Sequence, residues 1–254
     1  MLKLRHFRHA ALAALAAITF IAAARGQAVT GFSDLNFWGS GPNRSALVIN
    51  WSDGKSNQTI AWGYSWSGAT TVADMLFALV NADPRLFARI DSATQFGPGI
   101  FGIGYDTNGN GSFSVIGAQD TLGNPTTPVF TSGISNMNTN PNTTQAPLSS
   151  TTAAPGDAAD HYLEGWFDNG FWELLNGTVA PTYPVTWTSS FDGASGTMLV
   201  NDGWFALSIT DPDFNSHIPG PAMAAPVPEP GVIVLLAIGA IAVLAHVKTR
   251  VHAA

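Results

Sequence analysis

Oxygen-bearing side chains recur at every second position in one short segment of the chain. Asp106, Asn108 and Asn110 occupy its first, third and fifth positions, and Gly111 occupies the sixth. This spacing is typical of a calcium loop, because Ca²⁺ takes six to eight hard oxygen ligands around a tight turn. The twelfth position is Gly117 and not the bidentate Glu of an EF-hand. The segment therefore predicts either a site for Ca²⁺ as a cofactor or a metal-free Asn-Gly turn.

A second candidate site combines aromatic rings with carboxylates. Trp166 and Trp172 stand close in sequence to Glu164 and Asp168. Exposed tryptophan rings can stack on sugars, whereas most large aromatic side chains are buried in the core. We predict that this segment is a ligand surface for an extracellular polysaccharide, with burial in the core as the alternative.

The same acids raise the question of glycoside hydrolysis, which needs two carboxylates on opposite sides of a sugar. Glu164, Asp168 and Glu173 are close in sequence, but Gly165 and Gly170 oppose a regular helix that would align them. The chain also lacks a Gly-x-Ser-x-Gly elbow and a P-loop. We therefore predict a protein without enzymatic activity, and a glycoside hydrolase is the last of our alternatives.

The elements that would position these residues are mainly strands. Residues 46–51 are apolar, and residues 59–66 alternate between apolar and polar positions beyond an Asp53-Gly54 turn. This pattern predicts a β-hairpin. Trp62 and Trp66 share one face of the second strand, so we expect both in the core.

Helices are predicted only in the segment that follows this hairpin. Thr71 and Asp74 form a capping-box pattern before an apolar run, which predicts a helix over residues 72–82. Pro84 comes shortly afterwards and predicts a second short helix beginning near Arg85.

Two further Asn- and Gly-containing turns predict two more hairpins. One would pair residues 100–105 with 113–116, and the other would pair 198–200 with 204–209. Residues 120–157 are rich in Thr, Ser, Asn, Pro and Gly and predict a long flexible loop. The expected fold is mainly β, either a β-rich α+β domain or a decorated β-sandwich, with one or two short helices.

The N-terminal segment has the pattern of a secretory signal. Basic residues precede an apolar run over residues 10–24, and small residues follow it. This pattern predicts a signal peptide over residues 1–26, cleaved after Gly26 or after Ala28. The alternative is an uncleaved membrane anchor, for which 15 residues are short, since a spanning helix needs about 20. We expect one exported domain over residues 27–218.

The C-terminal segment has three parts in a fixed order. Pro228, Glu229 and Pro230 are followed by an apolar segment over residues 231–247, and then by Lys248 and Arg250. Residues 228–254 together resemble a PEP-CTERM sorting signal, with residues 219–227 as a Pro- and Ala-rich spacer before it.

The resemblance implies a Gram-negative bacterium and two processing partners, the general secretion machinery and an exosortase. The latter is a membrane protease-transpeptidase that would remove the tail near the Pro-Glu-Pro triplet. The basic end would stay on the cytoplasmic side of the membrane, so the body lies outside. The alternative is a C-terminal helix that is retained as a permanent anchor.

The charge of the exported part restricts its partners. Between residues 27 and 227 the only bases are Arg44, Lys55, Arg85 and Arg89, whereas 17 acidic residues occur in the chain and all except Glu229 lie there. Such a surface opposes nucleic-acid binding, which needs clustered Lys and Arg. It would approach an acidic polysaccharide only through divalent cations. The chain has no Cys, which excludes disulfides and thiolate metal sites.

Together these patterns predict a route and a class of function. We expect an exported protein that is held in the membrane by its C-terminal helix and is then delivered to the cell surface or extracellular matrix. Its predicted role is non-enzymatic. The alternative is a calcium-assisted carbohydrate-binding or adhesion module.

Overall fold

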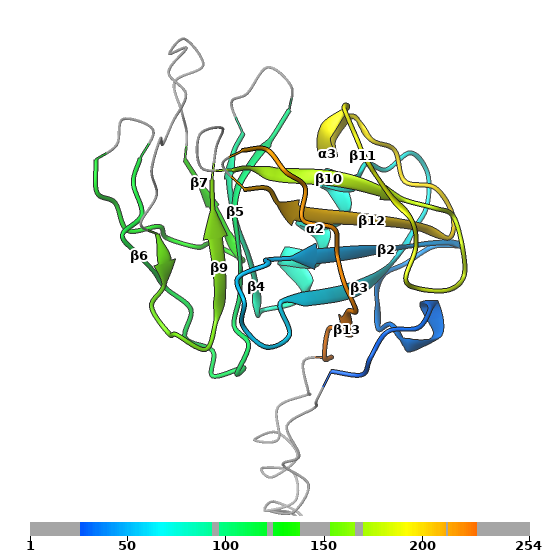
Figure 1. Cartoon of the computed structure of the whole chain (residues 1–254), viewed down its shortest axis with the longest axis horizontal. Helices are drawn as coiled ribbons and strands as arrows, with labels where there is room; N and C mark the ends of the chain where they lie inside the picture. The colour runs from blue at the N-terminus through cyan, green and yellow to red at the C-terminus, as the bar shows by residue number, and fades with distance from the viewer. Residues whose placement is uncertain are drawn as a thin grey trace, which may run out of the picture.

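The computed structural model describes residues 26–92, 97–120, 124–137, 153–165, 170–211 and 213–227. The predicted signal peptide, apart from Gly26, and the predicted sorting signal lie outside these residues. The described chain is mainly β, as the sequence predicts, with two sheets, a small strand pair and two short α-helices (Figure 1). No helix in this part is long and apolar enough to cross a membrane.

The larger sheet has seven strands and contains the first predicted hairpin. β2 (Asn43–Asn50) and β3 (Thr59–Trp66) pair antiparallel along their full lengths. β12 (Gly203–Ile209) lies parallel to β2, and β10 (Trp172–Gly177) lies antiparallel to β12. The remaining strands are at the edges: β11 (Trp187–Ser189) beside β10, and both β1 (Phe37–Gly39) and β13 (Met223–Ala224) beside β3.

The smaller sheet has four strands in the order β7 (Ile134–Asn136), β4 (Leu86–Asp91), β5 (Gly99–Tyr105) and β9 (His161–Glu164). β5 and β9 are antiparallel, and Tyr105 pairs with His161 at one end of the ladder. A separate pair, β6 (Val115–Ile116) and β8 (Ala154–Pro155), lies beside β9 (Figure 1). The ends of β5 and β9 therefore bring residues 106 and 160 together.

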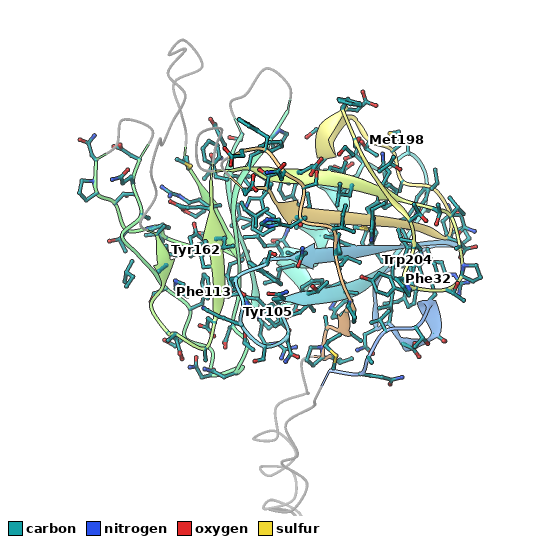
Figure 2. All side chains as sticks on the ribbon, in the orientation of Figure 1. Phe32, Tyr105, Phe113, Tyr162, Met198 and Trp204 are labelled. Atoms are coloured by element: carbon teal, nitrogen blue, oxygen red, sulfur yellow. The ribbon has the colours of Figure 1, made fainter. Side chains whose placement is uncertain are left out.

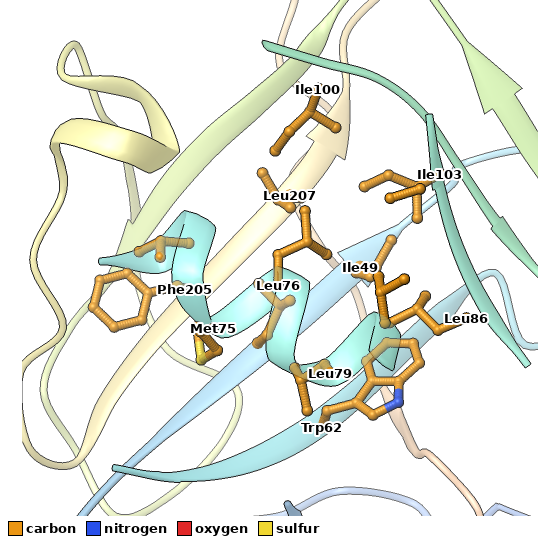
Figure 3. Close-up of a cluster of buried hydrophobic side chains, with 14 of the residues drawn as sticks. Ile49, Trp62, Met75, Leu76, Leu79, Leu86, Ile100, Ile103, Phe205 and Leu207 are labelled. Atoms are coloured by element: carbon orange, nitrogen blue, oxygen red, sulfur yellow. The ribbon is translucent and has the colours of Figure 1, made fainter. Parts of the chain in front are cut away.

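Helix α2 (Val72–Ala82) has the predicted bounds and connects the two sheets. The Thr71 side chain accepts a hydrogen bond from the Asp74 backbone N–H, and Asp74 accepts one from the Thr71 N–H. Leu76 and Leu79 on its buried face belong to a cluster that includes Ile49 of the larger sheet and Ile103 of the smaller one (Figure 3). Apolar burial on this face stabilises the packing of both sheets.

The larger sheet is also covered on its other face. The short 3₁₀ helix η1 (Phe32–Asp34) places the Phe32 ring 4.7 Å from the Trp204 ring of β12 (Figure 2). Tyr183 packs against the same tryptophan. Trp62 and Trp66 lie in the core between the sheets, as predicted.

Three local predictions were wrong because tertiary pairing overrides turn signals. Residues 86–91 form β4 where a second helix was predicted, because the chain after Pro84 completes the smaller sheet. Residues 100–105 and 113–116 do not form a hairpin: β5 pairs with β4 and β9, and β6 pairs with β8. Residues 198–200 do not pair with β12, which lies between β2 and β10. The second α-helix is instead α3 (Gly193–Gly196).

The predicted flexible loop at 120–157 contains folded elements. β7 adds to the edge of β4, where the Ala88 N–H donates to the Gly133 carbonyl and the Met137 N–H donates to Ile90. β8 pairs with β6 near the end of the segment. Edge strands are held largely by backbone hydrogen bonds, so they need little of the hydrophobic patterning that the prediction required.

The predicted spacer at 219–227 is also part of the fold. β13 lies in it, and Ala222, Ala224 and Ala225 are buried. The Ala225 N–H donates to the Ala61 carbonyl of β3, and the Asn36 side chain donates to the Ala225 carbonyl. Alanine is small enough to fit between the sheet and the N-terminal segment, so a composition typical of a linker here forms a closely packed strand. The folded domain extends to Pro226, whose carbonyl accepts a hydrogen bond from Arg85.

Candidate functional site

The Asp106 loop (residues 106–111) begins where β5 ends and is organised by its first carboxylate. Asp106 is buried, and its Oδ1 accepts a hydrogen bond from the Gly109 N–H at 2.7 Å. Its Oδ2 accepts one from the Gly111 N–H at 2.8 Å. Gly109 and Gly111 have φ values of 66° and 74°, which favour glycine. The sequence forms this turn locally because carboxylate and glycines occur at the required spacing.

The two asparagines of the loop direct their side chains toward one further carboxylate. Asn108 Oδ1 accepts a hydrogen bond from the Asn110 N–H, and Asn110 Oδ1 accepts one from the Ser112 N–H. Their amide groups donate to Asp157 Oδ2 at 2.9 and 3.2 Å. Asp157 is contributed by an acidic turn (residues 157–160) that precedes β9. The Ala159 N–H and the Asn108 amide lower the pKa of Asp157.

Asp160 completes this group of oxygen atoms. It is fully buried, and its Oδ1 accepts a hydrogen bond from the Thr107 N–H at 3.1 Å. Its Oδ2 has no hydrogen-bond partner among the described residues. Burial raises the pKa of Asp160 to about 6, and the negative charges of Asp106 and Asp157 act in the same direction. An unpaired buried carboxylate oxygen is costly unless a cation or a proton compensates it.

A buried His–Asp pair lies beside this group. His161 Nδ1 hydrogen-bonds to Asp53 Oδ2 at 2.8 Å, and the His161 ring stacks on Trp51 with 4.9 Å between centroids. Lys55 reaches the Asp160 carbonyl and lies 3.9 Å from Asp53 Oδ2. The pair fixes the position of β9 against the turn after β2. His161 is fully buried, which opposes a role as an accessible catalytic base.

The predicted calcium residues are thus brought together, and sequence reasoning missed two others. Asp106, Asn108 and Asn110 share one loop, as their spacing predicts. Asp120, the next carboxylate after the loop, accepts hydrogen bonds from the Asn124 backbone N–H and side chain. Asp157 and Asp160 come from about 50 residues away along the chain, a distance that loop spacing does not reveal. Their Asp-x-x-Asp spacing directly before His161 was the only available signal in the sequence.

The predicted aromatic ligand surface is not assembled by the described residues. Trp166 and Asp168 lie outside them. Trp172 is buried in the core and donates to the Leu163 carbonyl at 3.3 Å. Glu164 is also buried, in an ion pair with Arg89 at 2.7 Å, and it accepts a hydrogen bond from Tyr162. Neither Trp172 nor Glu164 can therefore contact a sugar in this structure, because both side chains are buried.

The two described acids of the glycosidase alternative face different regions. Glu164 and Tyr162 alternate with Leu163 on β9, so they point away from the core between the sheets. Glu173 alternates with Trp172 and Leu174 on β10 and accepts a hydrogen bond from Ser189. The two carboxylates therefore lie on the outer faces of different sheets. This arrangement cannot flank one glycosidic bond.

The acidic residues around the Asp106 loop are the remaining candidate for function. In the described part of the chain, no three His, Asp or Glu side chains could hold a metal ion by themselves. Comparisons with protein-family models, curated proteins and solved structures found no match for this chain.

Proposed function

We propose that this protein is exported and sorted to the cell surface or extracellular matrix, where it acts without catalysis as a structural component. The observation that carries the proposal is the C-terminal order of Pro228-Glu229-Pro230, an apolar segment and a basic end, in a chain that begins with a signal-like segment. An exosortase would recognise the triplet and remove the tail. General secretion would deliver the body across the inner membrane first.

The positions at which the folded domain begins and ends support the proposed removal of both targeting segments. At one end the Gln27 carbonyl accepts a hydrogen bond from the Ala224 N–H at 2.7 Å, and Ala28 bridges Met223. At the other end the last hydrogen-bonded group among the described residues is the Pro226 carbonyl, two residues before the triplet. Cleavage after Gly26 and near the triplet would therefore remove both ends without cutting a strand.

The proposal of a role without catalysis is supported by the positions of Glu164, Glu173 and His161. Glu164 forms an ion pair with Arg89, and His161 is buried and hydrogen-bonded to Asp53. Glu173 lies on the other sheet, where it accepts a hydrogen bond from Ser189. The adhesion alternative loses one of its two predicted aromatic contacts, because Trp172 is buried; Trp166 lies outside the described residues. We therefore retain the structural role.

The test follows the full chain in a Gram-negative host with and without an exosortase. We expect the exported wild-type protein to lack the tail beyond the triplet, by intact mass, and to leave the membrane fraction. P228A and E229Q should remain as longer, membrane-bound forms, as should wild type in the host without the exosortase. D192N, which removes an exposed carboxylate elsewhere, should be processed normally. An exported protein that keeps its tail whenever the exosortase is present would refute the proposal.

A further inference from the structure

The Asp106 loop contains two consecutive Asn-Gly pairs, Asn108-Gly109 and Asn110-Gly111. All four residues are exposed to solvent. Glycine has no side chain to shield its backbone nitrogen, and it readily adopts the positive φ values of 66° and 74° found here. The nitrogen that follows each asparagine can therefore approach the side-chain amide carbon of that asparagine. Attack of this kind expels the side-chain amide as ammonia, a reaction called deamidation.

Backbone N–H groups hold the two side-chain carbonyls in position for this attack. Asn108 Oδ1 accepts a hydrogen bond from the Asn110 N–H at 3.0 Å, and Asn110 Oδ1 accepts one from the Ser112 N–H at 2.7 Å. A side chain that bonds to the backbone two residues ahead is folded over the peptide between them. Each amide carbon therefore lies on the side of the intervening glycine nitrogen, and the donated N–H stabilises negative charge on the amide oxygen during attack.

Asp106 is placed to remove the proton from each attacking nitrogen. Its Oδ1 accepts the Gly109 N–H at 2.7 Å, and its Oδ2 accepts the Gly111 N–H at 2.8 Å. A general base must lie within hydrogen-bond distance of the proton that it removes, and this one carboxylate meets the condition for both glycines. Asp106 is 1% exposed, so little water competes with the two N–H groups for its oxygens.

The amide nitrogens that must leave are held by another carboxylate. Asn108 Nδ2 and Asn110 Nδ2 donate to Asp157 Oδ2 at 2.9 and 3.2 Å. These bonds oppose rotation of the amides, so each carbonyl oxygen stays at its backbone donor. Because both asparagines are exposed, ammonia released from them reaches water directly.

We infer that Asn108 and Asn110 are modification sites at which the folded chain catalyses its own deamidation, with Asp106 as the base. The glycine nitrogen forms a bond to the side-chain amide carbon and gives its proton to Asp106. The bond from that carbon to the amide nitrogen then breaks, and ammonia leaves with the proton. Water opens the resulting succinimide ring to an aspartyl or isoaspartyl residue. One water is consumed and one ammonia is released at each site, and no oxidant or reductant takes part.

Deamidation would change the contacts between the Asp106 loop and the acidic turn. Each conversion replaces an amide that donates to Asp157 with a carboxylate, and like charges repel. The loop follows β5 and the acidic turn precedes β9, so the repulsion acts where these paired strands meet. The protein would therefore lose stability as it ages. This inference is independent of sorting, because it depends only on the body of the protein.

A third Asn-Gly pair in the described part of the chain provides an internal comparison. Asn176 and Gly177 lie in β10, where Asn176 pairs with Thr188 on one side and with Phe205 on the other. The side chain of a strand residue stands away from its own backbone. Asn176 Oδ1 has no hydrogen-bond partner among the described residues. The same dipeptide here lacks the folded-over side chain that the Asp106 loop provides.

The test follows the purified full chain in detergent at neutral pH, both folded and in concentrated urea, with peptide mapping by mass spectrometry. Each conversion raises the peptide mass by the difference between an amide and a carboxyl group. We expect Asn108 and Asn110 to convert faster in the folded chain than in urea, and Asn176 to convert more slowly. Equal or slower conversion at positions 108 and 110 in the folded chain would overturn the inference, because the fold would then not catalyse the reaction.

Substitution of the base separates catalysis from exposure of the loop. D106N keeps the size of the side chain but cannot take up the proton. It should slow conversion at both asparagines by at least about tenfold, since general base catalysis contributes roughly 10²- to 10⁴-fold. D192N is the matched control, because it removes an exposed carboxylate distant in sequence and should convert as wild type does. Conversion in D106N at the wild-type rate or faster would contradict the role of Asp106. The comparison of folded with unfolded wild type does not depend on whether D106N folds.

Thermal unfolding gives a second readout of the same reaction. The melting temperature of wild type stored in the folded state should fall as deamidation proceeds. The double variant with N108Q and N110Q should keep its initial melting temperature during storage, because glutamine would have to close a larger ring. An equal decline in both proteins would show that the loss of stability has another cause and would count against the inference.

Discussion

Trp62 and Trp187 are both buried tryptophans of the larger sheet, but their indole nitrogens differ. Trp62 Nε1 donates to Asp83 Oδ2 at 2.9 Å, whereas Trp187 Nε1 has no partner among the described residues. We expect W62F to lower the free energy of unfolding by about 3 kcal/mol, because it leaves a cavity and removes a donor from a buried carboxylate. W187F removes an unsatisfied donor and should cost about 1 kcal/mol or less.

Urea denaturation at neutral pH, followed by tryptophan fluorescence, measures both changes in the full chain. The decisive quantity is the difference between the losses of unfolding free energy in W62F and W187F, since both variants replace tryptophan with phenylalanine. Equal losses would show that the Trp62–Asp83 hydrogen bond contributes nothing beyond packing.

Asp53 gives the molecule a predictable response to acid. Burial tends to raise its pKa, but the hydrogen bond and charge of His161, helped by Lys55, outweigh burial and lower it below 3.8. The unfolded chain therefore takes up this proton first as the pH falls. The stability that Asp53 contributes is complete above the unfolded pKa and is lost as the pH falls through the folded one.

We accordingly expect the unfolding free energy of the wild type to decline below about pH 4. D53N should be less stable than wild type near neutrality and should decline less steeply in acid. Urea midpoints between about pH 6 and pH 2 provide the comparison. Parallel curves for the two proteins would contradict the assigned shift.

At the level of elements, the correct predictions concern structure that depends on residues close together in the sequence. Helix α2 has the predicted bounds because its capping box and apolar periodicity are local signals. The β2–β3 hairpin was also predicted, since an apolar run and an alternating segment lie on either side of a short connection. The parallel pairing of β12 with β2 could not be predicted, because it joins distant segments and has no turn between them.

The same division applies to the candidate site. The spacing of Asp106, Asn108 and Asn110 is local, and the loop forms as the spacing predicts. Asp157 and Asp160 reach it only because β9 pairs with β5, which no local pattern reports. Burial of Trp172 likewise depends on the second sheet packing over β10, so its aromatic character alone could not distinguish a ligand surface from a core.

β13 contributes to the stability of the fold, although the sequence predicted only a spacer at this position. The Ala224 N–H donates to Gln27, and proline at this position has no N–H to donate. We expect A224P to lower the free energy of unfolding by about 2 kcal/mol through the lost hydrogen bond and the poorer fit of the ring. V227P places the same residue after the last tethered carbonyl, at an exposed position, and should change stability by less than about 0.5 kcal/mol.

Chemical denaturation of the full chain with each proline variant distinguishes a strand from a spacer. A spacer would tolerate both substitutions equally. Hydrogen exchange supplies an independent readout, because the amides of Ala224 and Ala225 should be protected in the wild type and released in A224P.

At the scale of the whole molecule, the folded chain begins and ends at one edge of the larger sheet. Ala28 bridges Met223, and β13 lies beside β3 at the same edge (Figure 1). Both predicted targeting segments therefore leave the body from adjacent positions. Residues near both ends of the described domain therefore pair at this edge of the larger sheet. Their pairing opposes strand pairing between two copies of the protein at the same edge.

These contacts favour one of the two predicted signal-peptide cleavage positions. Cleavage after Ala28 would remove the Gln27 carbonyl that accepts the Ala224 N–H, and the Gln27 side chain that donates to Asp34. Cleavage after Gly26 preserves both contacts. We therefore expect the exported protein to begin at Gln27, and intact-mass measurement of the exported fraction determines the first residue.

Two variants test which bond signal peptidase cleaves. Signal peptidase requires a small residue directly before the cleaved bond. G26L should therefore block processing and leave the longer precursor, whereas A28L places the same side chain two residues beyond the bond, where we expect cleavage after Gly26 to continue. A mature protein that begins at Val29, or processing that A28L blocks and G26L does not, would show that the domain tolerates loss of its first paired residues. The edge beside β13 would then be closed by β13 alone.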